Sequence, residues 1–530
     1  MVPRLTGLSR LGLACVACLT GCVMVGPDFH PQHEEWVEHW DDPVFEKAIS
    51  QQSQPDFSQW WHVFGDQNLE RLMTEADAHN ANLKIAGLRV LEARAQLGIA
   101  QSGRYPQVQQ IGGDALYTKS KHSGGGGANS SGSWQYGVGF DIGWELDFWG
   151  RFRRAIEAAN ASYFASQANH DAVLVLLHAQ VADTYFTMRT AEARLKIARE
   201  NAALQKRSLE ITDALFKSGQ TDELDLQQAK TQYLSTLSTI PNFESQITLA
   251  QHALSTLIGR PPGPLPELNE QPGKEGVIPL VDRAVLQDVP ANLLLRRPDV
   301  RAAELYMASQ SALIGVAKAD LYPTVTLLGT LAWSASSSSG TPSSILSASE
   351  VAGSPSKLAL AVGPSVTWNV FDHGRIVNNV RVQDARLQQL TVAYQDTVRQ
   401  AAREADDAAT GLIAALQRDS ALFDAEKAAS RSLSLANTVY REGYSDFERV
   451  LDAQRALAAQ QDAYVVNRSN AVGSLIALYK AVGGGWHTEQ PMIDPATREQ
   501  MEQRTNWGDL IKEESNAPST TVPTPAGQSR

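Results

Sequence analysis

The sequence predicts a mixed α/β membrane protein, in which long β-strands cross a bilayer and very long helices continue from them. Three observations lead to this fold class. A sixteen-residue stretch alternates strictly between apolar residues and polar residues or glycine, a segment of about sixty residues contains neither proline nor glycine, and pairs of motifs recur 224 residues apart. The alternation predicts the strands, the uninterrupted segment predicts the helices, and the recurrence predicts two copies of one unit.

The alternating stretch covers residues 133–148. Its even positions are all apolar or aromatic and its odd positions are all polar or glycine, so a strand here has one apolar face. A strand of a soluble sandwich is the alternative, but such strands usually have five or six residues. A barrel strand that crosses a bilayer needs about 9–11 residues, with aromatic side chains at the interfaces. We therefore expect a lipid-facing set, which is Trp134, Tyr136, Val138, Phe140, Ile142 and Trp144, with Val362, Val366 and Trp368 from the second copy.

The first residues predict a secretory signal that occupies residues 1–21. Arg4 and Arg10 precede a short apolar run, which is too short to span a membrane as a helix. The run ends in Leu-Thr-Gly-Cys22, which resembles a bacterial lipobox and implies cleavage before Cys22 and lipidation of its sulfur. Val23 follows, whereas an Asp at that position usually signals retention in the inner membrane, so an outer-membrane lipoprotein is expected.

Composition excludes several classes of function. Loss of the signal removes Cys15 and Cys18 and takes the formal charge from −12 to −14, which argues against a disulfide framework and against a nucleic-acid partner. No apolar run reaches the roughly 18 residues of a spanning helix. The eleven His residues form no HExxH pattern, and the glycines at 124–127 lack the Gly-Lys-Ser/Thr of a phosphate loop. The sequence therefore predicts no enzyme, no metal site and no cofactor other than the lipid on Cys22.

The internal repeat defines the organisation of the chain. Trp144 matches Trp368, Gly219 matches Gly443, and further pairs share the offset of 224, whereas Tyr105-Pro106 matches Tyr322-Pro323 at an offset of 217. The difference of seven residues arises between the two expected strands, which indicates an exposed loop. The expected domains are a lipidated arm at 22–65, repeat 1 at 66–260, a linker at 261–291, repeat 2 at 292–485, and a largely disordered tail at 486–530.

Each repeat is expected to read helix, two strands, and two long helices, and the first helix of repeat 1 is expected over 69–100. The strands are expected at about 104–121 and 133–148, then at 322–335 and 358–371. Pro364 lies inside the last of these and predicts a bend or a bulge. The long helices are expected at about 150–212 and 221–258, then at 374–437 and 445–482. Apolar residues recur every seven positions along the first helix of each pair, from Leu174 and from Ala401, which indicates a seam against a neighbouring helix. A helical hairpin inside an ordinary globular core is the alternative.

Four strands cannot close a barrel, and an open sheet edge in lipid leaves backbone groups unpaired. The strands are therefore expected from several chains around a symmetry axis, and a homotrimer would supply twelve.

Four motifs carry a resemblance to a known family. They are the segment from Cys22 to Phe29, the segment LLRRPDVRAAE at 294–304, the segment IGVAKADLYP at 314–323, and Tyr440-Arg-Glu-Gly443 followed by Val450 to Arg455. In these motifs, and over nearly the whole mature chain, the sequence resembles the outer membrane factor (TolC-like) family, in its lipoprotein branch that serves multidrug efflux. One departure is Val439, where family members often carry Arg, so the contact made by that Arg is not expected here.

The resemblance implies a trimeric channel with a 12-stranded outer-membrane β-barrel, continued by a long periplasmic α-helical coiled-coil barrel. Its partners would be outer-membrane lipid, a periplasmic membrane-fusion adaptor and an inner-membrane, proton-driven pump of the RND type. The function implied is passive conduction of drugs or other small toxic molecules to the exterior. A channel for type I protein secretion and a periplasmic structural or adaptor-like coiled-coil lipoprotein remain the alternatives, and the strict strand alternation argues against the latter.

The turns near Gly219 and Gly443 are expected at the periplasmic end, where acidic residues cluster. Acids at a helix N-terminus favour the helix dipole, which by itself accounts for Asp222 and Asp446. Asp452 lies about two turns further on, and its spacing from Arg455 puts both on one helix face. In the family, the Asp and Arg matching this pair lie at the closed tip. The expected gate is therefore Asp452, Arg455, Asp446, Tyr440, Asp222 and Asp225.

Overall fold

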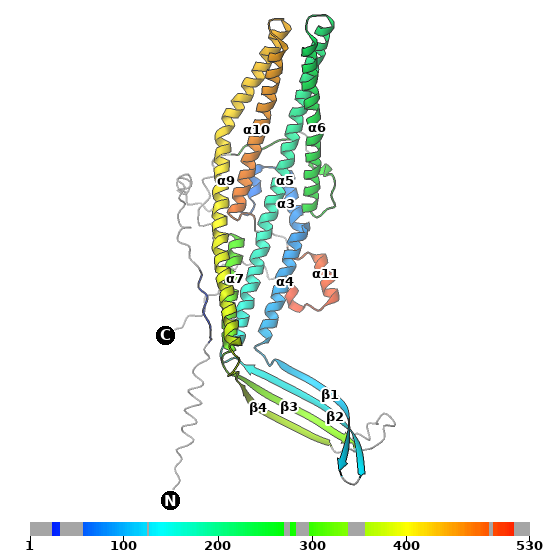
Figure 1. The fold of residues 1–530 in the computed structure, drawn as a ribbon, viewed down its shortest axis with the longest axis vertical. Helices are drawn as coiled ribbons and strands as arrows, with labels where there is room; N and C mark the ends of the chain where they lie inside the picture. Colours follow the sequence, from blue (N-terminus) through cyan, green and yellow to red (C-terminus); the bar gives the residue numbers. More distant parts are fainter. Residues whose placement is uncertain are drawn as a thin grey trace. The chain divides into compact units, whose positions relative to one another are not determined.

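The computed structural model describes residues 24–31, 57–124, 127–269, 276–281, 296–337, 356–486 and 491–512 of the 530-residue chain (Figure 1). The signal at 1–21, the lipidation site Cys22, most of the arm, residues 282–291 of the linker and the last eighteen residues lie outside these ranges. The chain forms two compact units. The first draws on 1–31, 93–164 and 305–392, and the second on 32–92, 165–304 and 393–530.

The first unit contains a four-stranded antiparallel sheet in the order β1-β2-β3-β4 (Figure 1). The strands are β1 (Val108–Gly124), β2 (Gly127–Leu146), β3 (Thr324–Ser337) and β4 (Ser356–Thr367). Strand β2 pairs with β3, although they belong to different repeats, with Phe140 opposite Leu331. The two hairpins of the repeat therefore join into one continuous sheet, and β1 and β4 are its edges within the chain.

Strand β4 has no bulge at Pro364, so that part of the expected bend or bulge was wrong. Pro364 lies opposite Leu327, and the pairing continues residue by residue on both sides, from Leu358 opposite Trp333 to Val366 opposite Val325. Proline removes one backbone N–H donor, and the N–H of each strand residue points toward only one of the two neighbouring strands. Because β4 is an edge strand of this sheet, it pairs with β3 on one side only, and the regular register is maintained.

The helices reproduce the repeat with the same lengths in both copies. Helices α5 (Arg151–Lys217) and α9 (Arg375–Arg441) have 67 residues each, and α6 (Glu223–Leu257) and α10 (Phe447–Ala481) have 35 each. Both pairs begin and end 224 residues apart. The shorter helices α4 (Ala81–Ser102) and α7 (Pro298–Ala319) have 22 residues each and are 217 apart, so the offset changes between the helix and the second strand.

Helix α3 (Gln67–His79) and α4 are separate, although one helix was expected over 69–100. Asn80 interrupts them with an extended backbone, and its side-chain amide donates to the carbonyl of Leu257 at the end of α6. In the second repeat Arg297 precedes α7 and donates to the carbonyl of Ala481 at the end of α10. The last carbonyls of a helix have no partner within it, so the residue before α4 or α7 caps the long helix of its own repeat.

The core of the second unit lies between the long helices and the segment around Trp60 and Trp61. The first seam residues, Leu174, Val181 and Met188, are fully buried, as is Ala401 on α9. Trp60 stacks on Tyr479 of α10 with ring centroids 5.1 Å apart. The end of the N-terminal arm thus belongs to the helical core, where it completes the burial of the seam. No helix in the described part of the chain is both long and apolar enough to span a membrane.

The segment 491–512 has regular structure, which corrects the expectation of a largely disordered tail from 486 onward. It contains α11 (Pro495–Arg504) and a 3-10 helix, η6 (Gly508–Ile511). Asp494 caps α11 and lies 3.5 Å from the ammonium of Lys84 on α4, while Met492 packs directly on Gly87. Local polarity suggested disorder, but contacts with α4, distant in sequence, determine the structure here.

Candidate functional site

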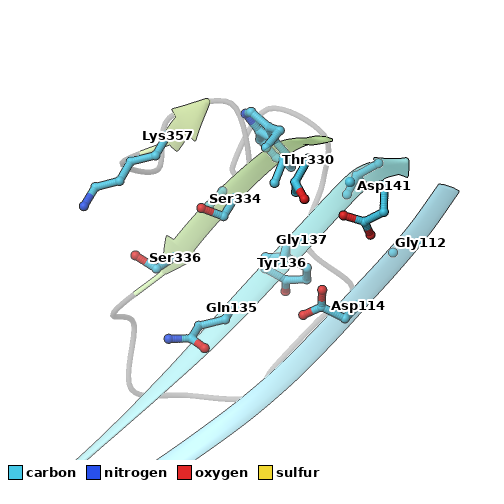
Figure 2. Close-up of a pocket in the computed structure, with 16 residues that line it drawn as sticks. Gly112, Asp114, Gln135, Tyr136, Gly137, Asp141, Thr330, Ser334, Ser336 and Lys357 are labelled. Atoms are coloured by element: carbon cyan, nitrogen blue, oxygen red, sulfur yellow. The ribbon is translucent and has the colours of Figure 1, made fainter. Parts of the chain in front are cut away.

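One face of the sheet is a polar hollow of ≈ 740 Å³ (Figure 2). It is lined by odd-numbered positions of β2 and their neighbours, including Asp114, Asp141, Thr330, Ser334 and Lys357. Two even-numbered residues of β2, Tyr136 and Val138, also line it. Glycines occupy many positions on this face, so its floor is largely backbone. The hollow can hold water and polar solutes because carboxylate, hydroxyl and ammonium groups surround it.

The charged side chains of the hollow follow the strand register. Asp114 of β1 is opposite Gly137 of β2, which is opposite Ser334 of β3 and then Lys357 of β4. An acid and a base therefore lie at the two ends of one row across the sheet (Figure 2). A Cβ on Gly137 would collide with the carboxylate of Asp114, so glycine is what lets this acid lie over the sheet.

The opposite face carries the residues expected to face lipid. Phe140 is opposite Ile111, and Ile142 is opposite Gly329, which is opposite Val362. Val138, Phe140, Ile142 and Trp144 are all more than a third exposed, and Val362 and Val366 still more so. Trp134 and Tyr136 are half-buried and stack on each other, and Trp368 follows the end of β4 and remains exposed. The face is thus apolar across all four strands, and contact with lipid stays a prediction.

A second candidate site lies at the two helical turns. Each long helix ends in a glycine with positive φ, Gly219 at +74° and Gly443 at +77°. The chain closes each turn with the same bonds, from Gln220 N to Leu215 O and from Tyr444 N to Val439 O. This left-handed C-cap is strained for residues with a Cβ, which is why glycine recurs at both positions.

The acids after these turns differ between the repeats. Asp222 is the N-cap of α6, and its carboxylate accepts from the backbone N–H of Asp225, 3.1 Å away. Asp225 in turn accepts from the hydroxyl of Thr221. Asp446 occupies the N-cap of α10 without a side-chain cap bond. Asp222 therefore stabilises the start of its own helix, where an acid was expected to favour the helix dipole, and Asp225 is bonded within the same turn. The carboxylate of Asp446, for which the dipole argument was also made, makes no cap bond.

Asp452 and Arg455 face each other on α10, with 3.8 Å between carboxylate and guanidinium. Arg455 also donates through Nε to the side-chain oxygen of Gln232 on α6, 3.2 Å away. The next contact links α10 to α5, from Gln454 Nε2 to Ser208 Oγ at 2.8 Å. The pair thus belongs to a set of polar bonds that join α10 of the second repeat to both long helices of the first.

Tyr440 lies on the apolar side of this region. Its ring packs edge-on against Phe447, 5.4 Å away, beside a small core formed by Ala229, Leu433, Phe447, Val450, Leu451 and Leu457. The helices near the turns are therefore held by a small apolar cluster and by exposed polar bonds.

Sequence reasoning did not identify Asp114 and Lys357, nor the partners Gln232, Ser208 and Gln454. A sequence signal for Gln454 was available, since it is a polar residue between the apolar Leu451 and Leu457. The structure buries it, with 5% of the residue exposed. The row of Asp114 and Lys357 depends on the pairing of β2 with β3, which a single sequence does not specify.

These features define a class of protein: a membrane channel subunit that contributes four strands with one apolar and one polar face, together with two long helical hairpins. The sequence profile of the outer membrane efflux protein family matches residues 72–260 and 289–484, which include both repeats. The chain belongs to this family, and it is an outer-membrane efflux channel.

Several characterised proteins are similar over most of the chain. A probable outer membrane lipoprotein, SilC of Salmonella typhimurium, is 28% identical over 90% of this chain and 99% of its own length. The cation efflux system protein CusC of Escherichia coli O6:H1 is 30% identical over 81% of this chain and 88% of its own. The pyoverdine export outer membrane protein OpmQ of Pseudomonas putida is 30% identical over 92% of this chain and 99% of its own.

Solved structures are similar as well. The outer-membrane channel OprN superimposes with a TM-score of 0.75 at 29% identity, over 88% of this chain and all of that one. The open state of the MtrE channel of Neisseria gonorrhoeae gives a TM-score of 0.71 at 27% identity, over 88% of this chain and 99% of that one. The predicted fold class, a trimeric outer-membrane channel with four strands per chain and long periplasmic helices, is confirmed.

Proposed function

We propose that this chain is the outer-membrane component of a tripartite efflux system for small molecules. It would receive its cargo through a periplasmic membrane-fusion adaptor from an inner-membrane pump of the RND type, and would conduct the cargo passively to the exterior. The observation that carries this proposal is that the family match covers both helical repeats, including both turns.

The relatives support small cargo. Their names describe efflux of cations and export of pyoverdine, and none of the three named above describes protein export. The polar hollow, with two carboxylates and one ammonium per chain, suits hydrated and charged solutes of this size. A type I protein-secretion channel is the second candidate, and the experiment below distinguishes the two.

The proposed gate consists of Asp452 and Arg455, with Tyr440 and Asp446 beside them and with Asp222 and Asp225 at the neighbouring turn. Three-fold symmetry would triple each charge around the axis and give a ring that attracts cations. Arg455 bridges α10 and α6 through Gln232, so separating the hairpins requires breaking this bond. We propose that adaptor contact at the turns replaces these interactions when the channel opens.

The proposed lipidation of Cys22 would anchor the mature chain to the outer membrane. Support comes from the lipobox and from the similarity to an outer membrane lipoprotein.

Deletion of the gene tests the function. We expect the deletion strain to accumulate small toxic compounds and to grow at two- to fourfold lower concentrations of them, with recovery on complementation. Deletion of the cognate adaptor gene alone should give the same susceptibility, because the channel does not transport by itself. Unchanged susceptibility together with the loss of one protein from the culture medium would favour protein secretion instead.

A further inference from the structure

The segment Met24–Pro31 lies on the first unit, where a single buried arginine holds it. Arg154, in the first turn of α5, is 2% exposed and donates to three groups of this segment. These acceptors are the carbonyl oxygens of Val25 at 3.3 Å and Gly26 at 3.4 Å, and the carboxylate of Asp28 at 2.7 Å. Val25 donates its own N–H to the carbonyl of Trp149, 3.1 Å away.

Among the residues that the structure describes, Glu157, 2.8 Å away on the same helix, is the one partner that Arg154 would keep without this segment. A buried guanidinium with most of its donors unpaired is costly, so the arginine and the segment depend on each other.

Two glycines, Gly315 and Gly150, form the seat on which the segment lies, and a third, Gly26, belongs to the segment itself. A Cβ on Gly315 of α7 would come within 2.7 Å of the carbonyl oxygen of Val25 and 2.8 Å of Cγ of Arg154. A Cβ on Gly150 would come within 2.6 Å of the side chain of Met24, and one on Gly26 would collide with the backbone of Gly315. The backbone of the segment therefore approaches α7 more closely than any other residue type would permit.

The repeat supplies a natural comparison. The counterpart of Gly315 is Gly98 of α4, 217 residues earlier, and a Cβ there would meet nothing within 4 Å. The counterpart of Arg154 is Asn378 of α9, which accepts from Arg381 and belongs to no such set of bonds. The seat is thus a specialised feature of one repeat copy, and general packing of this fold does not require it.

Aromatic residues continue from the seat, because Trp149 directly precedes Gly150. Trp149 stacks on Tyr322 with ring centroids 4.6 Å apart, and its indole N–H donates to Pro323 O at 2.8 Å. The indole of Trp368 donates to Leu321 O at 3.0 Å while its ring is 57% exposed. We call Trp149, Tyr322 and Trp368 the aromatic belt. Tryptophan and tyrosine, which combine an apolar ring with one polar atom, are typical of residues at the headgroup level of a membrane.

We propose that Met24–Pro31 is a strap that Arg154 clamps into the glycine seat, and that the clamp holds the lipid of the outer-membrane anchor at the level of the aromatic belt. Residue 22 precedes Met24 by two positions, and an extended chain spans at most about 3.6 Å per residue. A clamped strap therefore limits the anchor to within about 7 Å of Met24. The partner is a lipid surface at its headgroup zone. The anchor part of this proposal rests on the proposed lipidation, whereas the binding of the strap does not.

Hydrogen exchange of the Val25 amide in the purified full-length protein in lipid nanodiscs tests the clamp. We expect protection in the wild type, and exchange at least tenfold faster in Arg154→Gln and in Gly315→Ala. Gly98→Ala is the matched control, because it makes the same change in the counterpart helix where there is space, and it should exchange like the wild type. Equal Val25 exchange in the wild type, Arg154→Gln and Gly315→Ala would overturn the proposal.

Two further measurements keep the test decisive. If both clamp variants lose their helical circular dichroism, Asp28→Ala decides instead, since it removes one exposed acceptor of Arg154, and unchanged Val25 exchange in it would count against the clamp. A nitroxide at His30→Cys reports depth by power saturation, and Gly315→Ala should broaden or shift that depth while Gly98→Ala should not. The same nitroxide depth in Gly315→Ala and Gly98→Ala would contradict the part of the proposal that concerns the lipid anchor. Neither readout uses the pump, so a failure of the efflux proposal, seen as unchanged susceptibility, is separable.

Discussion

At the scale of single residues, the ion pair of Asp452 and Arg455 near the helical turns is weak within one chain. Their side chains are 70% and 58% exposed, so solvent screens the pair, and within one chain it contributes between about 0 and 1 kcal/mol. The hydrogen bond from Arg455 to Gln232 extends this contact to a second helix, because it joins α10 to α6. Weak, exposed bonds of this kind suit a closed gate, because contacts with an adaptor must be able to replace them when the channel opens.

Asp452→Ala combined with Arg455→Ala should raise the open probability or the conductance of the channel in planar bilayers. The reason is that the bridge to α6 and the proposed charge ring are lost together. Block by multivalent cations should weaken in the same recordings.

The control for this variant is Arg199→Ala with Glu244→Ala. This pair also joins two helices, α5 and α6, at 2.7 Å and is about half exposed, but it lies outside the proposed gate. Currents that change equally in both double variants would assign the effect to general loosening of the helices.

Arg297 gathers two acids around the end of α10. It donates to Asp299 at 2.8 Å and to Glu404 at 3.1 Å, in addition to its cap bond. Burial alone would raise the pKa of Asp299, but the hydrogen bonds and charge of Arg297, with the N–H of Val300, lower it below its ordinary value. A carboxyl whose pKa is lower in the folded state adds stability above its unfolded pKa of about 3.9, and this stability disappears as the pH falls through the folded pKa.

Asp299→Asn should therefore destabilise the helices at pH 7 and have little effect in strong acid. Because Asp299 is 41% exposed, we expect a cost of only about 1 kcal/mol at pH 7. Thermal unfolding followed by circular dichroism between pH 7 and about pH 2.5 measures the difference. Asp509→Asn, at an exposed pair with Lys512, is the control and should change the midpoint much less. A difference that stays constant down to the lowest pH would show that the carboxylate charge does not stabilise this site.

At the scale of elements, β2 separates two environments with single-residue precision. Phe140 and Asp141 are neighbours in sequence, yet Phe140 belongs to the row of Ile111 and Leu331 and Asp141 lines the hollow. The alternation of the strand is sufficient for this separation, because successive side chains point to opposite faces.

Phe140→Arg should abolish assembly in the outer membrane, whereas Asp141→Arg should be tolerated. A cationic side chain on the lipid face near the middle of the membrane costs roughly 2–4 kcal/mol, while one in the hollow remains in water. Heat-modifiable migration of the outer-membrane fraction measures assembly for both variants. Equal tolerance at the two positions would mean that the apolar face does not contact lipid.

At the scale of the whole molecule, the chain closes its β-barrel only together with other copies of itself. Strands β1 and β4 have one partner each within the chain, and an unpaired edge is not tolerated in the hydrocarbon region. The family solution is a trimer, which makes a closed barrel of twelve strands from three four-stranded sheets.

The mature protein should accordingly have the native mass of three chains in mild detergent, and its first residue should be a lipid-modified Cys22. Native mass spectrometry gives the first quantity and peptide mass spectrometry of the N-terminus the second. An unmodified Cys22 would contradict the proposed lipid anchor. A stable monomer that still conducts ions would contradict the prediction that three chains are needed to close the barrel.

The sequence by itself determined the repeat, the element types and the faces of the strands. These follow from local periodicity and from spacing, and the long helices were identified because α5 has neither proline nor glycine over most of its length. The sequence also predicted the turns at Gly219 and Gly443. The structure has a positive φ at both, a conformation that favours glycine.

Only the tertiary structure decided which residues meet across the repeats. The bond from Arg455 to Gln232 spans 223 residues, the row from Asp114 to Lys357 crosses four strands, and Arg154 binds a strap about 126 residues before it. The tertiary structure also decided the helix α11 in the polar tail and the regular strand register at Pro364. Such contacts depend on the three-dimensional packing of distant segments, and local patterns of polarity and propensity do not encode which segments pack together.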